Sequence, residues 1–165
     1  MNRRYSLWLS GDLMLLLFMA MVIYTFPLEP SIPYLQFTYS ENAFKAVLEQ
    51  WGSEGIEQFR RHFVIDFPFL VSYGIFGFLF SKNSPILSRQ TAVIRSFMVW
   101  GLPVAASLDA VENLIHLHLI AGANETASAL YLAAGIVVGS KWRLIAAFVV
   151  ATAYFWHKAS LAKSR

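Results

Sequence analysis

The sequence of 165 residues contains no cysteine, and only 14% of its residues are charged. The absence of cysteine excludes disulfides, thiolate metal sites and a cysteine nucleophile. Soluble domains carry roughly 25% charged residues, so this low charge, combined with 57% hydrophobic residues, excludes an ordinary soluble domain. The net charge of +3 is small and dispersed, which argues against a nucleic-acid partner. Nucleophile-elbow, phosphate-loop and dinucleotide-binding motifs are also missing, so no short motif names a reaction.

The sequence instead contains long apolar runs. Four of them, at about residues 7–26, 62–80, 93–120 and 127–156, approach or exceed the length of about 20 residues that a transmembrane helix needs. No small-residue cleavage site follows the first run, so we expect an uncleaved span and not a signal peptide. The predicted fold class is all-α: a polytopic membrane protein with four transmembrane helices in a bundle, forming a single domain over residues 1–165.

The predicted outer loop, residues 27–61, has an internal pattern. Ser40 is a suitable N-cap for a short amphipathic helix over residues 41–51, and Gly52 is a suitable stop. The helix carries one apolar stripe at i, i+3, i+4 and i+7, formed by Phe44, Val47, Leu48 and Trp51. It is expected either to lie on the membrane surface or to cap the bundle. The prolines between residues 27 and 33 favour an extended exit from the first span.

Lysine and arginine are distributed unevenly between the connections. One side of the predicted bundle holds seven bases and no acid: Arg3, Arg4, Lys82, Arg89, Lys158, Lys163 and Arg165. The other side holds Lys45, Arg60 and Arg61 against six glutamates. The positive-inside rule therefore predicts that both termini are cytoplasmic, in the inner or plasma membrane of the cell. On the outer side, residues 124–126 predict a tight turn and N-cap, with glycosylation of the Asn-Glu-Thr triplet as the alternative.

Ionisable residues inside the predicted spans indicate a site. A charge at the centre of a bilayer costs at least about 2.5–3.5 kcal/mol, so such residues usually face the bundle and find partners. The third span carries four polar residues at i, i+3, i+4 and i+7, which places them on one helical face: Asp109, Glu112, Asn113 and His116. At 1.5 Å per residue, Asp66 on the second span and Lys141 on the fourth lie at a similar depth. Tyr73 shares the face of Asp66.

The candidate ligand-binding residues are therefore Asp66, Tyr73, Asp109, Glu112, Asn113, His116 and Lys141. Three interpretations stay open. The cluster is a structural or partner-binding polar network, a site that binds or translocates a small or lipidic ligand in the outer half of the bilayer, or an enzyme site in which a carboxylate pair does acid–base work. The surplus of acids over Lys141 favours a proton on one acid, a bound cation or a further basic partner. The ligand site is our leading hypothesis, with membrane lipids as the expected surroundings.

Two i, i+4 pairs raise the question of a metal. His62 with Asp66 and Glu112 with His116 each present two ligand atoms on one helix face. Because neither a H-E-x-x-H nor an E-x-x-H signature is present, the sequence predicts no metal site. It indicates no cofactor and no oligomeric state. Among the remaining charges, Asp12 is expected to form an inner ion pair with Arg95, and the sequence suggests no role for Arg143.

Three segments carry a resemblance to a known family. They are residues 46–52 (AVLEQWG), 66–73 (DFPFLVSY) and 108–113 (LDAVEN), in that order. Over about residues 35–145 the chain resembles a family of small four-helix integral membrane proteins, mostly bacterial. The resemblance implies that six of the candidate residues belong to the family pattern, namely Asp66, Tyr73, Asp109, Glu112, Asn113 and Lys141, but it implies no chemistry. The chain is also similar in general layout to the four-helix sterol-isomerase and sigma-2 receptor group, whose intramembrane acids line a ligand cavity.

Overall fold

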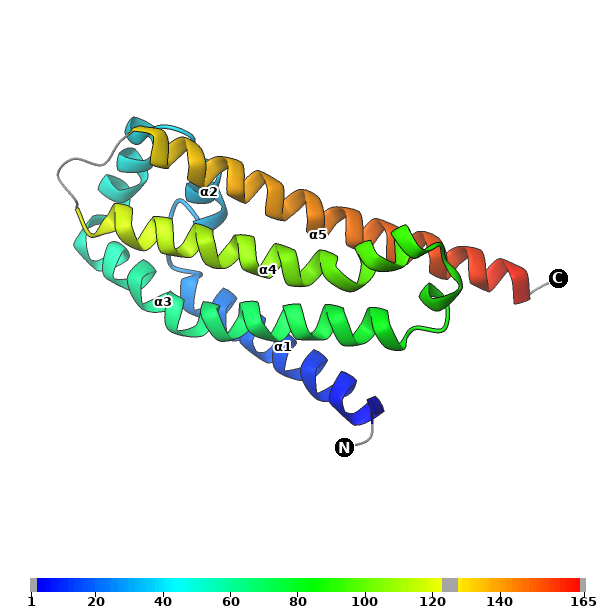
Figure 1. Cartoon of the computed structure of the whole chain (residues 1–165). Helices are drawn as coiled ribbons and strands as arrows, with labels where there is room; N and C mark the ends of the chain where they lie inside the picture. The colour runs from blue at the N-terminus through cyan, green and yellow to red at the C-terminus, as the bar shows by residue number, and fades with distance from the viewer. Residues whose placement is uncertain (1–2, 123–127, 164–165) are drawn as a thin grey trace.

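The computed structural model describes residues 3–122 and 128–163, the side chains of residues 3, 4 and 163 excepted (Figure 1). The described residues form helices and no strand: α1 (Arg3–Thr25), α2 (Ile32–Gln36), α3 (Glu41–Asn83), the short 3-10 helix η1 (Leu87–Arg89), α4 (Ala92–Ile120) and α5 (Ser128–Lys163). Four of these helices are long and apolar enough to cross a membrane. The predicted all-α class with four membrane-spanning helices is confirmed.

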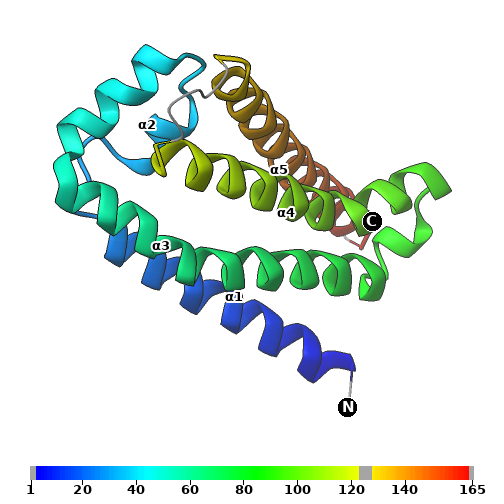
Figure 2. The ribbon, with the colours of Figure 1, turned by 60° about the vertical axis from the view of Figure 1, so that its left-hand side comes forward.

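The long helices pack in an open order. α1 lies along α3, α3 along α4, and α4 along α5, which leaves α1 and α5 as the two edges of the arrangement (Figure 2). α1 begins, α3 passes into α4, and α5 ends at the same end of the molecule (Figure 1). This arrangement agrees with an even number of membrane crossings. The turn and glycosylation alternatives for residues 124–126 lie outside the described residues.

A kink divides α3 at Gly52. This residue has φ 61° and ψ −170°, a conformation that is essentially restricted to glycine. The segment before it is the predicted amphipathic helix, and the Ser40 side chain accepts a hydrogen bond from the backbone N–H of Ala43, as an N-cap does. Phe44 is buried on this segment, and its ring meets that of Tyr131 on α5 with centroids 5.5 Å apart. The amphipathic helix therefore packs on the end of the bundle, as expected for a cap.

The exit from α1 differs from the prediction. The chain is not extended throughout, because residues 32–36 form α2, with Pro33 in its first turn. Proline is tolerated there since the first helical N–H groups have no partner in the helix. The indole N–H of Trp51 donates to the carbonyl of Pro30 at 2.7 Å and ties this segment to the capping helix. α2 contacts both α3 and α5 and so bridges the two sides of the bundle at the end opposite the N-terminus.

Close packing fixes α3 against α4. A Cβ built on Gly77 would lie only 2.5 Å from the Cβ of Leu102, so the backbone of α3 approaches α4 more closely than any larger residue permits. One turn further along α3, Ser81 Oγ donates to the carbonyl of Met98 at 2.6 Å. Small residues at the interface and hydroxyl-to-carbonyl bonds are the usual means of helix association in lipid. The α3–α4 pair is therefore a rigid base for the residues described next.

Candidate functional site

The seven candidate residues lie together between α3, α4 and α5, and all are buried. Asp66 and Tyr73 come from α3, four residues from α4, and Lys141 from α5. Six of them are linked to at least one other by a hydrogen bond or an ion pair, and His116 lies beside Glu112, one turn away on α4. We call this set the polar cluster: Asp66, Tyr73, Asp109, Glu112, Asn113, His116 and Lys141.

Lys141 is the centre of the cluster. Its Nζ lies 2.7 Å from Oδ1 of Asp109 and 2.5 Å from Oε2 of Glu112. The two acids are three residues apart on α4, so one turn of helix presents both toward the ammonium group. Burial of a lysine is tolerated only when its charge is paired, and here two carboxylates share that task.

The other half of the cluster joins α3 to α4. The Tyr73 hydroxyl donates to Oδ2 of Asp109 at 3.2 Å. The Asn113 side-chain amide donates to Oδ2 of Asp66. Asp109 therefore receives donors on both oxygens, whereas Oδ1 of Asp66 receives no hydrogen bond from the described residues.

Glu112 is the most deeply enclosed member of the cluster, with no exposed surface. Neither of its oxygens has a hydrogen bond of normal geometry with the described residues, although Oε2 contacts Lys141. Its Oε1 lies 3.8 Å from Nδ1 of His116, beyond hydrogen-bond distance. The His116 ring is held by aromatic neighbours and stacks on Phe44 with centroids 5.7 Å apart. A buried oxygen without a partner is costly, and Oε1 of Glu112 is such an oxygen among the described residues.

The cluster contains more acid than base. Three carboxylic acids meet one lysine, and His116 is the only other group in the cluster that can become cationic. With all three acids ionised, Lys141 would compensate only one negative charge. A surplus of this kind in a low-dielectric setting is relieved by a proton, by a cation or by a ligand that donates hydrogen bonds.

A cleft opens onto the cluster from the side. It has a volume of about 590 Å³, and four members of the cluster line it: Asp66, Tyr73, Asp109 and Lys141. Its walls are apolar, with Phe18 of α1 on one side and Ile145 and Phe148 of α5 on the other. The cleft exists because α1 and α5 are the edges of the helix order and do not close against each other along their length.

α2 forms one end of the cleft. Ile32, Pro33 and Gln36 line it there, next to Thr25 at the end of α1. The lateral opening of the cleft consequently lies between α1 and α5, while its end at α2 is covered by protein. The α1 wall could not be predicted from the sequence, because α1 is apolar on nearly all sides and its exposed side chains include Trp8, Leu16 and Ile23.

His62 is a further polar residue that lines the cleft. Its Nδ1 forms a hydrogen bond with the carbonyl oxygen of Phe59, one turn earlier on α3. In the part of the chain that the structure describes, no three His, Asp or Glu side chains converge as metal ligands do. The i, i+4 pairs of His62 with Asp66 and of Glu112 with His116 therefore do not combine into one centre.

Three other charged residues of the spans stay outside the cluster. Asp12, Arg95 and Arg143 are all exposed. The predicted ion pair between Asp12 and Arg95 is absent from the described residues, so that prediction is wrong. The reason lies in the packing, because α3 stands between α1 and α4 and each carries its charge on an outer face. Nothing in the structure explains Arg143.

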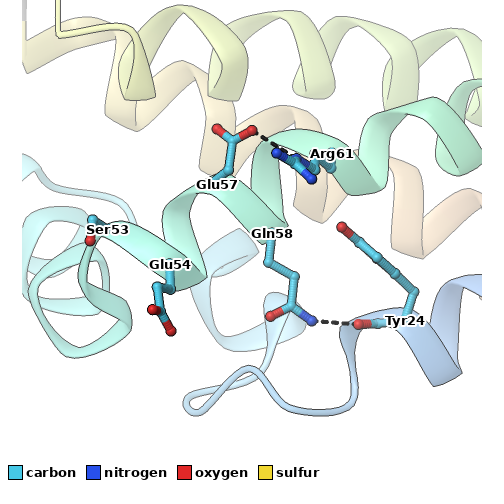
Figure 3. Close-up of a pocket in the computed structure, with 6 residues that line it drawn as sticks. All are labelled: Tyr24, Ser53, Glu54, Glu57, Gln58 and Arg61. Atoms are coloured by element: carbon cyan, nitrogen blue, oxygen red, sulfur yellow. Dashed lines mark hydrogen bonds and ion pairs between the residues drawn. The ribbon is translucent and has the colours of Figure 1, made fainter.

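A polar pocket of about 460 Å³ lies where α1 ends beside α3 (Figure 3). Gln58 donates to the carbonyl of Tyr24, and Arg61 pairs with Glu57 at 2.8 Å (Figure 3). Glu57 also meets Arg60 at 3.5 Å. The ion pairs of this pocket lie within α3, and the hydrogen bond from Gln58 to Tyr24 is the one that joins α1 to α3 here.

Comparison of the chain with models of protein families, with curated proteins and with solved structures finds no match.

Proposed function

We propose that this chain is a multi-pass protein of the inner or plasma membrane that binds an amphiphilic ligand, lipidic or small, at the polar cluster. Both termini are proposed to be cytoplasmic, because the connections at their end of the bundle carry the excess of lysine and arginine. The ligand enters sideways from the bilayer between α1 and α5. Its polar group rests on the cluster, and its apolar part lies against the walls of the cleft.

The observation that carries the proposal is the composition of the cleft. A volume of about 590 Å³ falls within the range of about 300–1,000 Å³ for small-molecule sites. Its walls are mainly apolar, and its charged groups, Asp66, Asp109 and Lys141, all belong to the polar cluster on its floor. Binding sites for small molecules combine these two features, since apolar walls supply affinity and a few polar groups fix orientation.

The chemistry of the floor favours a ligand that donates hydrogen bonds. Asp66 lines the cleft with one oxygen that no described residue supplies with a hydrogen bond. Lys141 is already shared between Asp109 and Glu112, so it has little capacity left for an anion. A hydroxyl or an ammonium group therefore suits the cluster, whereas a carboxylate or phosphate would add negative charge to a site that already has a surplus.

The enzyme alternative is kept for one reason. Carboxylic acids, a tyrosine and a lysine line or adjoin the same cleft, and such groups transfer protons when a substrate lies within hydrogen-bond reach. A bound ligand that leaves with a changed mass would support this reading. A ligand that leaves unchanged supports binding or translocation.

The test is native mass spectrometry of the full chain released from detergent micelles in the presence of dodecylamine, dodecanol or laurate. We expect the amine and the alcohol to form a saturable adduct with the wild type, and laurate to form none. Asp66→Asn should abolish the adduct. Asp12→Asn is the matched control, because Asp12 is also an aspartate of a membrane span but lies outside the cleft. Equal adducts in all three proteins, or none in any, would contradict the proposal.

A further inference from the structure

A second cavity continues the cleft toward the inner end of the bundle. It has a volume of about 630 Å³ and lies between α3 and α5. It shares three lining residues with the cleft, which makes the two one continuous groove: Phe76, Phe148 and Val149. Beyond these residues its walls are formed by Phe80 of α3 and by Thr152, Ala153 and Trp156 of α5.

We propose that this second cavity is a hydrocarbon-chain subsite, and that the ligand of the polar cluster is a long-chain amphiphile. The head group lies at Asp66 and Asp109, and the chain runs along α5 toward Trp156. This inference rests on the proposed function and deepens it by naming the class of ligand.

The polar atoms of the continuous groove support one orientation of the ligand. Four cluster side chains mark its outer part. In the second cavity the Thr152 hydroxyl is occupied, because it donates to the carbonyl of Phe148 at 2.8 Å. Ser160, at the far end, donates to the carbonyl of His157 at 2.7 Å. The stretch between the cluster and His157 therefore offers an apolar surface to a chain.

The length of the groove fits a membrane lipid chain. From Lys141 to Trp156 the α5 wall is about 22 Å long at 1.5 Å per residue. One leaflet of a bilayer core is about 15 Å thick, half of the roughly 30 Å of hydrocarbon. A chain of leaflet length consequently fits below the cluster, with its head toward the outer side and its end toward the inner side. This is the orientation of a lipid of the outer leaflet.

Aromatic side chains line the groove along this path. The rings of Phe76 and Phe80 stack with centroids 5.8 Å apart, and that of Phe80 meets Phe148 edge-on at 6.4 Å. These contacts connect α3 and α5 at a level where neither helix packs extensively on the other. Rings held by one another form a fixed wall, so the groove is expected to persist when no ligand is bound.

The experiment uses two photoreactive forms of hexadecylamine, with a diazirine next to the amine or at the chain end. The full chain is reconstituted in phosphatidylcholine nanodiscs, irradiated, and its labelled peptides are mapped. We expect the head-end probe to label around Tyr73 and Trp142, and the chain-end probe to label residues 148–160. Unlabelled hexadecylamine should compete with both probes, and hexylamine should compete at least tenfold less well, a loss of about 1.4 kcal/mol or more.

A blocked groove provides the second arm. Ala153→Trp should reduce chain-end labelling about tenfold, a change of about 1.4 kcal/mol in binding. Ala147→Trp is the matched control, because Ala147 is an exposed alanine of the same helix that does not line the groove. If Ala153→Trp does not fold, the competition by hexylamine in the wild type decides alone.

The outcomes separate the two proposals. One outcome is that unlabelled amine competes with the head-end probe while the chain-end probe labels residues scattered over the lipid-facing surface. This outcome would overturn the chain subsite and leave the proposed function standing. Equal competition by hexylamine and hexadecylamine would do the same. Labelling that no amine competes away, at either end, would overturn both.

Discussion

Lys141 Nζ lies 2.7 Å from Asp109 Oδ1, and this contact joins the last helix of the bundle to the α3–α4 pair. The lysine is buried and its second partner, Glu112, is fully enclosed. Because Asp109 also lines the cleft, the same contact holds α5 in place and shapes the floor of the proposed site.

Removal of Lys141 should be strongly destabilising. Lys141→Met leaves two buried acids without their cation, and breaking a buried pair in this way costs about 3–5 kcal/mol. Adding Asp109→Asn should restore part of the loss, because it removes one of the uncompensated charges. Thermal unfolding in detergent measures both effects. Arg143→Met is the control on the same helix, and its exposed charge should be removable with little change. Independent, harmless effects at Lys141 and Asp109 would show that they do not form a coupled pair.

Glu112→Gln should separate function from stability. Glutamine has the shape of glutamate and can keep the contact with Lys141, whose charge stays paired with Asp109. We therefore expect the free energy of unfolding to change by less than about 1 kcal/mol. Binding of dodecylamine should be lost, because the charge pattern beneath the cleft changes. Asp66→Asn should behave in the same way. A collapsed fold with either variant, or full binding with both, would favour a purely structural network.

The close approach of α3 to α4 predicts opposite effects for two buried glycines. Gly77→Ala should lower stability by about 1–3 kcal/mol, because its Cβ would lie 2.5 Å from that of Leu102. Gly101→Ala should be neutral or stabilising by up to about 1 kcal/mol, since the nearest side-chain atom to its Cβ is 3.8 Å away. Melting temperatures of the two variants provide the comparison. The reverse order would mean that the two helices are farther apart than described.

The proposed orientation is open to chemical labelling because the chain has no cysteine of its own. Asn42→Cys lies in the outer capping helix and Ser88→Cys in the connection between α3 and α4, and both positions are exposed. An impermeant maleimide added to intact cells should label only the cysteine at position 42. Labelling of both sites after permeabilisation is the control for access. Labelling at position 88 alone in intact cells would contradict the proposed topology and indicate the opposite one.

Much of this fold follows from local sequence patterns. The four long helices follow from apolar run length, the cap at Ser40 from its hydroxyl, and the break at Gly52 from the lack of a Cβ. The polar face of α4 also follows, because helical spacing alone puts Asp109 and Glu112 on one side. Equal depth then brings Lys141 to that face from another helix.

The cleft could not be predicted in the same way. The cleft depends on the order in which the helices pack and on the angle between α1 and α3. The periodicity of a single helix predicts neither. The predicted ion pair between Asp12 and Arg95 was wrong for the same reason, because it required α1 and α4 to be neighbours. α2 was missed because prolines permit a first helical turn as readily as an extended chain.

The most direct test of the account is an experimental density map of the protein, purified from its own membrane in a mild detergent. We predict elongated non-protein density in the cleft between α1 and α5, with its polar end within hydrogen-bond distance of Asp66 or Asp109 and its chain beside Phe148. A map in which α1 closes against α5 over direct contacts within the polar cluster, with no room for a ligand, would contradict the central claim.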